Sequence, residues 1–350
     1  MSKFKFPIIY YRMPDKTEVC FLQSDCNAVE IDSLDDIPLN SGFILYPFSS
    51  DSSCKPLFIH ASSYSKLNLE ELHGGSLRDL NWEIKDVFVS DMVSKNREEY
   101  CANVVSAVSK IQSGAIKKVV LSRVKEIKSN SFKNPLRVFY KLCMKHPAAF
   151  VSLVYIPENL VWITATPELL ISADQDKIET VSLAGTKPLE NMEEWGEKEK
   201  IEQQVVTDYI RNVLQKYCEN ISVSGPQEVI AGNVKHIKTS FSAKLNTGLW
   251  NLVSALHPTP AVCGIPLDEA NQFIKQTEGY DRKYYTGFLG PCNMEGKTDL
   301  FVNLRCAEVL TDAVNLYIGG GITKDSVPEK EWEETELKSK TLLFAFEENE

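Results

Sequence analysis

Two predicted helices carry glutamates at positions where a divalent cation could bind between them. In the segment Glu331–Lys340, EWEETELKSK, the side chains of Glu331, Glu334 and Lys338 fall at i, i+3 and i+7, along one helix face. Glu202 lies on the other helix, beside its apolar stripe. One or two such carboxylates, together with waters and substrate oxygens, can form a Mg²⁺ site. The same spacing fits an exposed Glu334–Lys338 ion pair, so both interpretations remain open.

Glu202 is selected because of its place on its helix. The helix, EKEKIEQQVVTDYIRNVL, has an apolar stripe that includes Ile201 and Val205, and Glu202 borders that face. A carboxylate at this border needs a cation or hydrogen-bond donors to offset its lost hydration. Glu197 and Glu199 are predicted to point elsewhere, which leaves Glu202 as the candidate ligand of this helix.

Three further residues stand at strand ends. Lys118 begins the apolar strand KVVLSR, Glu168 follows Pro167 where a strand ends in a turn, and Gly185 closes the segment VSLAG. A lysine at a strand edge also discourages aggregation, and a glycine also permits a tight turn. A glutamate in a turn is also commonly solvated. These residues alone do not separate a catalytic from a structural role.

Arg305 is a candidate for binding an anion. It lies in the predicted strand VNLRCA, whose other side chains are largely apolar. A buried guanidinium needs an anion, which an acidic substrate could supply. His236 and His257 are interpreted as hydrogen-bonded core histidines. The histidines show no zinc spacing, and the sequence contains no dinucleotide, phosphate-loop or nucleophile-elbow glycine motif.

The elements that must position these residues predict an α+β fold. Residues 1–95 hold short strand-like runs, and later strands are expected to pair as hairpins around Pro157–Asn159 and Gln175–Asp176. Hairpins outnumber crossovers, which predicts large antiparallel sheets with helices packed outside. The last helix is expected to begin at a capping box formed by Ser326 and Glu329. Earlier helices are expected at about Ser94–Gly114, Pro135–Lys145, Glu193–Tyr217 and Leu267–Thr277.

The composition narrows the class of protein. The 350 residues are 43% hydrophobic and 25% charged, as in soluble globular proteins. The net charge of −10 argues against a nucleic-acid or membrane surface, because both select for lysine and arginine. The sequence contains no recognisable signal peptide or membrane span. The nine cysteines are scattered without a C-x-x-C pair, which is typical of reduced thiols in a cytoplasmic protein.

Several short stretches together resemble the chorismate-utilising enzymes, and most closely the isochorismate synthases. They occur in the family's order over about Lys118–Leu343, roughly two thirds of the chain, whereas residues 1–95 match only in general character. The stretches are KVVLSR, ATPELLIS, SLAGTKP, LHPTPAVCGIP, EGYDRKYYTGFLG, LRCAEV, GGGIT and EWEETELK.

The resemblance implies two similar α/β halves whose antiparallel sheets pack face to face, with helices outside. Residues 1–95 would form the β-rich start of one integrated domain, and residues 96–350 its chorismate-binding catalytic region. It also implies Mg²⁺ between carboxylates of two helices. These positions fall on Glu202 and Glu334, with Glu331 beside them.

The resemblance further implies conversion of chorismate to isochorismate, with Lys118 as general base and Glu168 as general acid. A free lysine titrates near pKa ~10.4 and a free glutamate near ~4.3, so each needs surroundings that favour the neutral form. Arg305 and Tyr285 match positions that hold the enolpyruvyl carboxylate, and Lys338 matches a substrate-carboxylate contact. Pocket-wall positions fall on Gly185, Ala261, Val262, Gly319 and Gly321.

Three alternatives remain beside the isomerase. A salicylate synthase would eliminate pyruvate after the same first step, but the loop LHPTPAVCG favours the isomerase. An anthranilate or aminodeoxychorismate synthase component would use ammonia, but Lys118 and LHPTP disfavour it. An inactive binding protein would be expected to lack some of Lys118, Glu168, Glu202 and Glu334. The family's Lys-Asp-Arg-His-Glu reads KEKIE here, so the metal's surroundings are expected to differ.

The expected form is a monomer with chorismate as substrate and no glutaminase partner. The choice between menaquinone and siderophore pathways stays open.

Overall fold

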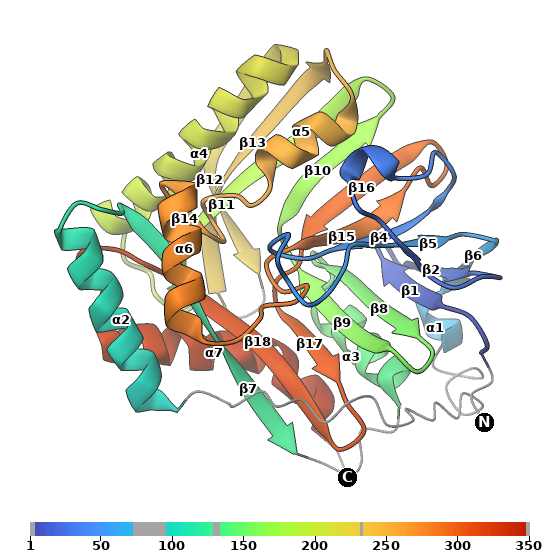
Figure 1. The fold of residues 1–350 in the computed structure, drawn as a ribbon, viewed down its shortest axis with the longest axis horizontal. Coiled ribbons are helices and arrows are strands. Elements are labelled where there is room, and N and C mark those ends of the chain that lie inside the picture. Colours follow the sequence, from blue (N-terminus) through green and yellow to red (C-terminus); the bar gives the residue numbers. More distant parts are fainter. Residues whose placement is uncertain (1–3, 73–95, 129–133, 232–233, 348–350) are drawn as a thin grey trace.

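The structure is a computed structural model that describes residues 4–72, 96–128, 134–231 and 234–347. Within these residues the strands form two nine-stranded sheets whose neighbouring strands all run antiparallel (Figure 1). The helices lie outside the sheets, which confirms the predicted α+β fold with two similar halves.

The first sheet supplies one wall of the site described below. Its strands are, in spatial order, β14 (Gly264–Ile265), β7 (Lys118–Lys128), β18 (Ala313–Ile322), β17 (Cys306–Val309), β9 (Leu160–Thr166), β8 (Phe150–Ile156), β1 (Ile8–Arg12), β2 (Glu18–Gln23) and β6 (Ser63–Asn68).

The second sheet supplies the opposite wall. Its strands are, in spatial order, β12 (Cys218–Ala231), β13 (Val234–Leu245), β11 (Lys177–Pro188), β10 (Leu169–Asp174), β16 (Lys297–Val302), β15 (Phe288–Cys292), β4 (Gly42–Tyr46), β5 (Leu57–His60) and β3 (Val29–Glu30).

The helices divide between the two sheets. Helices α4 and α5 pack on the second sheet, and α2, α3, α6 and α7 pack on the first. Their bounds are α1 (Leu69–Glu71), η1 (Leu34–Asp36), α2 (Arg97–Gln112), α3 (Pro135–Lys145), α4 (Glu197–Tyr217), α5 (Leu249–Leu256), α6 (Leu267–Glu278) and α7 (Pro328–Phe346).

The two sheets pack face to face through a core that combines aliphatic and aromatic side chains. Trp162 and Tyr317 from the first sheet and Phe43 from the second belong to one buried cluster. Phe150 of β8 stacks on Phe301 of β16 with ring centroids 4.2 Å apart. Separate apolar clusters lie under the outer helices of each sheet. Such buried apolar area is the main force that holds the two sheets together.

The N-terminal strands are shared between both sheets. Strand β1 pairs with β8 in the first sheet, and β4 pairs with β15 in the second. The predicted β-rich start is thus interleaved with the later chain as far as residue 72. The remainder of that prediction, residues 73–95, lies outside the described residues.

The predicted hairpins are confirmed, and most helix bounds lie close to those expected. Strands β8 and β9, and strands β10 and β11, pair antiparallel around the expected turns. Helix α3 has the predicted bounds, and α4 begins at Glu197 rather than at Glu193. For α2, the predicted start at Ser94 lies outside the described residues. The structure has α2 begin at Arg97, with Asn96 as its N-cap.

The predicted capping box of the last helix is wrong. Helix α7 begins at Pro328, but no side chain caps it. The Ser326 hydroxyl instead accepts a hydrogen bond from the Thr323 backbone N–H at 3.0 Å. The serine therefore closes the turn before the helix, a role that Ser side chains fill as readily as capping.

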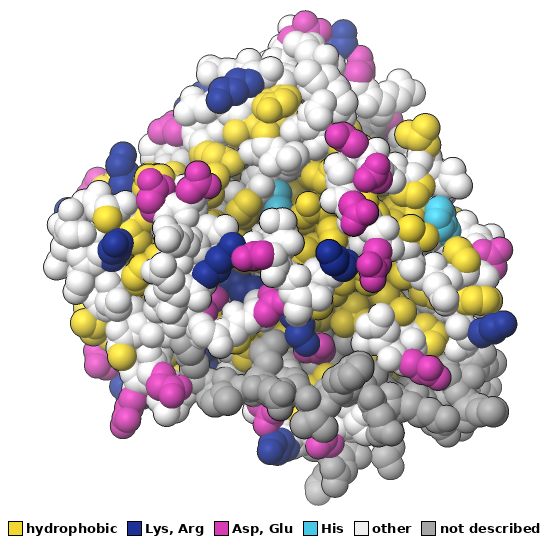
Figure 2. All heavy atoms as spheres, in the orientation of Figure 1, with side chains coloured by type: hydrophobic (Ala, Val, Ile, Leu, Met, Phe, Trp, Pro, Cys, Tyr) yellow, Lys and Arg dark blue, Asp and Glu magenta, His cyan; other side chains and the backbone are white. Residues whose placement is uncertain are grey.

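The surface carries both signs of charge. On the face drawn in Figure 2, lysines and arginines are interspersed with acidic residues rather than gathered in one patch. Among the described residues, no helix is both long enough and apolar enough to cross a membrane.

Candidate active site

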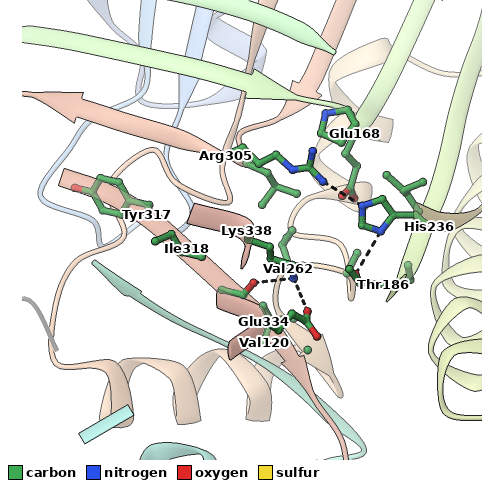
Figure 3. Close-up of a pocket in the computed structure, with 18 of the residues that line it drawn as sticks. Val120, Glu168, Thr186, His236, Val262, Arg305, Tyr317, Ile318, Glu334 and Lys338 are labelled. Carbon is green, nitrogen blue, oxygen red and sulfur yellow. Dashed lines mark hydrogen bonds and ion pairs between the residues drawn. The ribbon is translucent and has the colours of Figure 1, made fainter. Parts of the chain in front are cut away.

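A cavity of about 130 Å³, partly open to solvent, lies between elements of both sheets and the helices α4 and α7. Strands β7 and β18 contribute to one side of its wall, and β11 and β13 to another (Figure 3). Eleven of the residues singled out from the sequence line it, namely Glu168, Gly185, Glu202, Ala261, Val262, Tyr285, Arg305, Gly319, Gly321, Glu334 and Lys338.

A glycine run on β18 lets carboxylates from two helices approach the same strand. A Cβ atom added at Gly321 would lie 2.6 Å from Glu202 Oε1, which belongs to α4. A Cβ atom added at Gly320 would lie 3.6 Å from Glu334 Oε1 and 3.7 Å from Glu331 Oε2, both of α7. A Cβ atom at Gly321 would force the Glu202 carboxylate to shift, whereas one at Gly320 would only make ordinary contact with the carboxylates of α7. Gly321 is therefore the position where the approach of Glu202 requires glycine.

Two lysines neutralise part of this acidic cluster. Lys118 Nζ lies 2.8 Å from Glu202 Oε1, and both side chains are mostly buried, with 5% and 15% exposed. Lys338 Nζ lies 2.7 Å from Glu334 Oε1 and donates to the Gly319 carbonyl oxygen at 3.0 Å. Lys118 itself is absent from the cavity lining, but this ion pair joins it to a lining residue. Opposite charges at such distances offset the cost of burying each partner.

The remaining glutamates of α4 and α7 differ from expectation in one case. Glu331 is 3% exposed and lies beside Gly320 without lining the cavity. Glu199 was predicted to point away, yet it lines the cavity, with its Cβ 3.1 Å from a Cβ placed at Gly185. The error arose from the apolar stripe, because Ile201, assigned to the buried face, is 61% exposed.

The buried face of α4 is rotated from the predicted one. This face consists of Gln203, Val206, Thr207 and Ile210. Glu199 lies one helical turn before Gln203. Gln203 is buried because its amide donates to the Ser182 carbonyl and hydroxyl oxygens of β11. Apolar periodicity cannot reveal a face that is held by polar side chains.

Glu168 lies between β9 and β10 and is 5% exposed. Burial raises the pKa of this carboxyl to about 7, while the charges of Lys118, Arg305 and Lys338 act in the opposite direction. A carboxyl with this pKa is substantially protonated at neutral pH. It can therefore donate a proton, which an exposed turn glutamate could not do efficiently.

Arg305 was predicted to lie within a strand, and this is wrong. Strand β16 ends at Val302 and β17 begins at Cys306, so Arg305 occupies the connection between them. Its φ of 47° lies in the left-handed region, which is uncommon for a residue with a side chain and often marks a functional position. Its guanidinium points into the cavity (Figure 3).

Burial lowers the pKa of Arg305 to about 10, and the charge of Glu168 acts against that shift. The guanidinium is thus positively charged at neutral pH and can bind an anion. Tyr285 is 3% exposed, and its hydroxyl lies 2.7 Å from a Cβ placed at Gly319. The tyrosine and the glycine run therefore share one wall of the cavity.

Other lining residues were missed by sequence reasoning or given a purely structural role. His236 was interpreted as a core histidine, but its ring lies in the cavity wall beside Arg305 (Figure 3). Thr186, Val120 and Gly320 also line the cavity. All three lie in stretches that carry the resemblance, Val120 in KVVLSR, Thr186 in SLAGTKP and Gly320 in GGGIT, so a signal for them was available in the sequence.

The fold and the cavity define an enzyme-like α+β protein with a buried acid, a buried lysine and a buried arginine around one pocket. The model of the family "Chorismate binding enzyme" matches residues 67–347. The chain therefore belongs to the chorismate-binding enzymes.

Particular relatives carry two activities in their names. The isochorismate synthase EntC of Escherichia coli (strain K12) is 32% identical over 244 residues, which cover 66% of this chain and 62% of that protein. Component 1 of anthranilate synthase from Saccharolobus solfataricus is 30% identical over 280 residues, covering 75% of this chain and 65% of that protein. The chain thus spans just under two thirds of the length of each.

A solved structure supports the fold independently of these relatives. The structure of MenF, the menaquinone-specific isochorismate synthase from Escherichia coli, has a TM-score of 0.79. The match covers 97% of this chain and 89% of MenF, at 20% sequence identity. The similarity at this identity concerns the fold.

Proposed function

We propose that the protein is an isochorismate synthase, an isomerase that interconverts chorismate and isochorismate. The observation that carries the proposal is a pair of buried groups, Glu168 in the cavity wall with its pKa raised to about 7, and Lys118, which is joined to the wall through Glu202. The relatives named as isochorismate synthases support the same activity. The nine cysteines are all free, as is common for proteins of reducing compartments, and we propose a cytoplasmic location. We also propose that the protein acts as a monomer without a glutaminase.

In the proposed reaction, Lys118 Nζ accepts a proton from a water molecule whose oxygen bonds to C2 of chorismate. The ring double bonds shift, the C4–oxygen bond breaks, and Glu168 donates its proton to the departing hydroxyl, which leaves as water. One water enters and one leaves, so the product is an isomer of the substrate. Lys118 is an ammonium in its ion pair with Glu202, so it must leave that pair and give up a proton to solvent before its amine can accept a proton from the attacking water.

The carboxylates across the glycine run fit Mg²⁺, and we assign Glu202, Glu334 and Glu331 as the residues that would hold it. Their oxygens face neighbouring residues of β18 from two helices, and carboxylate oxygen is the donor that Mg²⁺ prefers. Among the described residues no three His, Cys, Asp or Glu side chains stand together as a group that could hold a metal ion, so these carboxylates would have to move closer together for all three to bind Mg²⁺. When bound, Mg²⁺ would stabilise the negative charge that builds on the ring carboxylate.

The remaining wall residues would hold the rest of the substrate. Arg305 and Tyr285 would bind the enolpyruvyl carboxylate, and Lys338 would contact a substrate carboxylate. Small residues would let the backbone approach the ligand; these are Gly185, Ala261, Val262, Gly319 and Gly321.

Arg305→Lys is expected to raise the KM for chorismate by about tenfold or more, because an ammonium cannot reproduce the two parallel hydrogen bonds of a guanidinium. Steady-state kinetics would measure the change. Arg211→Lys, on the exposed side of α4, is the matched control and should leave KM unaltered. A near-normal KM in Arg305→Lys would place Arg305 in a structural role.

The pH dependence of kcat/KM should show a falling limb with an apparent pKa near 7, the value to which burial raises Glu168. The sign follows from its role, since the acid must be protonated before it donates, and a rise in pH through 7 ionises it. A pH series from 5 to 9, each end about two units from that value, would test this. A profile without a falling limb would contradict the assignment of Glu168 as the acid.

Product analysis tests the proposed function and its alternatives together. The purified protein is incubated with chorismate and Mg²⁺, with and without ammonium chloride, and the products are separated by chromatography. Isochorismate in both samples supports the proposal. Salicylate with pyruvate would indicate a salicylate synthase, and anthranilate or aminodeoxychorismate formed only with ammonium would indicate the activity of the aminating relatives. Unchanged chorismate would indicate a binding protein.

A further inference from the structure

We infer that His236 is a positioning residue that fixes the orientation of the Arg305 guanidinium through a neutral imidazole acceptor. The inference rests on the proposed function in one respect, because Arg305 is taken to bind a substrate carboxylate. It concerns a residue that the proposed reaction does not otherwise use.

The hydrogen bonds of His236 determine which ring nitrogen carries the proton. Nδ1 lies 2.9 Å from the Gly185 carbonyl oxygen and 3.3 Å from the Thr186 hydroxyl. A carbonyl oxygen can only accept, so Nδ1 must be the donor and must carry a hydrogen. Nε2 is therefore left with a lone pair in the neutral ring. Arg305 Nη2 lies 3.1 Å from Nε2 and donates to it, as the dashed line in Figure 3 marks.

The backbone around Gly185 builds this arrangement. His236 on β13 is paired with Thr186 on β11, and the register of these strands shifts between Ala184 and Thr186. Gly185 occupies the shift with a φ of 68°, a conformation that suits glycine. Its carbonyl oxygen can thereby meet a ring on the neighbouring strand. The position of the imidazole is thus set by two strands of the second sheet.

The neutral state of His236 is maintained by its surroundings. The residue is 7% exposed, and burial together with the charge of Arg305 lowers its pKa to about 3. A protonated ring would lose the Nε2 acceptor and would place a second positive charge 3.1 Å from the guanidinium. The hydrogen bond to Arg305 therefore persists throughout the neutral pH range.

The consequence is an arginine whose plane is set before substrate arrives. A guanidinium has five N–H donors in a fixed fork, and tying one of them to His236 limits how the others can turn. Preorganisation of this kind reduces the ordering cost of binding a carboxylate. His236 acts through Arg305, so removing it should weaken chorismate binding more than it slows the chemical step.

The kinetic test compares two substitutions and their dependence on Arg305. His236→Leu removes the acceptor and should raise KM by about tenfold, with a smaller change in kcat. His236→Gln keeps an amide N–H for the Gly185 carbonyl oxygen and a carbonyl oxygen for Arg305, and should stay within about threefold of wild type. In an Arg305→Ala background, His236→Leu should have no further effect on KM. His60→Leu, on β5 away from the cavity, is the control.

Independent, additive losses from His236→Leu and Arg305→Ala would overturn the inference, as would an unchanged KM in His236→Leu. The wild type is assayed first, so a failed proposed function would appear there as absent isochorismate. If His236→Leu does not fold, a measurement on the wild type without substrate still tests the inference. In ¹⁵N-histidine NMR of the wild type, His236 should be neutral and protonated on Nδ1, and its Nε2 signal should move in Arg305→Ala. A proton on Nε2 of the wild type would also overturn it.

Discussion

Two single substitutions, Lys118→Ala and Glu168→Gln, are each expected to lower kcat by about 10²–10⁴-fold while chorismate still binds. The reason is that both side chains are assigned to proton transfer rather than to substrate capture. A glutamine has nearly the shape of the acid but no proton of suitable acidity to give. Stopped assays of product, with substrate affinity measured separately by calorimetry, would separate the two effects.

Matched controls and the reverse reaction sharpen this test. Lys117 is the exposed neighbour of the buried Lys118, so Lys117→Ala should retain full activity. Because the isomerisation is reversible, acid and base exchange roles in the reverse direction. Each variant should therefore slow both directions by the same factor and leave the equilibrium unchanged. A Lys118→Ala protein with wild-type kcat would end the proposed mechanism.

Removal of divalent metal by EDTA is expected to abolish turnover, and added Mg²⁺ should restore it. The carboxylates of Glu202 and Glu334 converge on β18 from two helices, and Glu334→Gln removes one charged oxygen donor from this site. We expect that variant to need at least about tenfold more Mg²⁺ for half-maximal activity. Calorimetric titration of Mg²⁺ into the protein gives a readout that does not depend on turnover.

The choice of control on α7 matters. Glu333 is exposed and adjacent to Glu334, so Glu333→Gln should leave Mg²⁺ dependence unchanged. Glu336 is a poor control because it forms ion pairs with Lys125 and with Arg123, whose side chain is 2% exposed. Loss of that partner would destabilise the fold. Full turnover in excess EDTA would rule out the metal assignment.

Much of the fold could be predicted because local signals agreed with tertiary structure. Pro135 occupies the first turn of α3, and the apolar face of that helix is buried as its spacing indicates. The hairpin of β8 and β9 follows from two apolar runs joined by a short turn. The resemblance located the cavity because its motifs supply most of the lining residues.

The errors arose where non-local polar contacts override local pattern. Glu199 belongs to the cavity because Gln203 is held by the neighbouring strand, which periodicity of apolar residues does not record. Arg305 leaves the strand through a left-handed backbone angle, which no residue type at that position predicts. His236 is buried and hydrogen-bonded as expected, but the identity of its partner depends on a strand register set across the sheet.

The source of the C2 oxygen is the most direct test of the central claim, which is attack by water at C2 with loss of the C4 hydroxyl. Wild-type protein is incubated with chorismate and Mg²⁺ in H₂¹⁸O, and the products are measured by mass spectrometry. The account predicts isochorismate that carries one ¹⁸O at C2, and recovered chorismate that gains ¹⁸O at C4, because water attacks C4 and the C2 oxygen leaves in the reverse reaction. Unlabelled isochorismate, or no isochorismate, would contradict it.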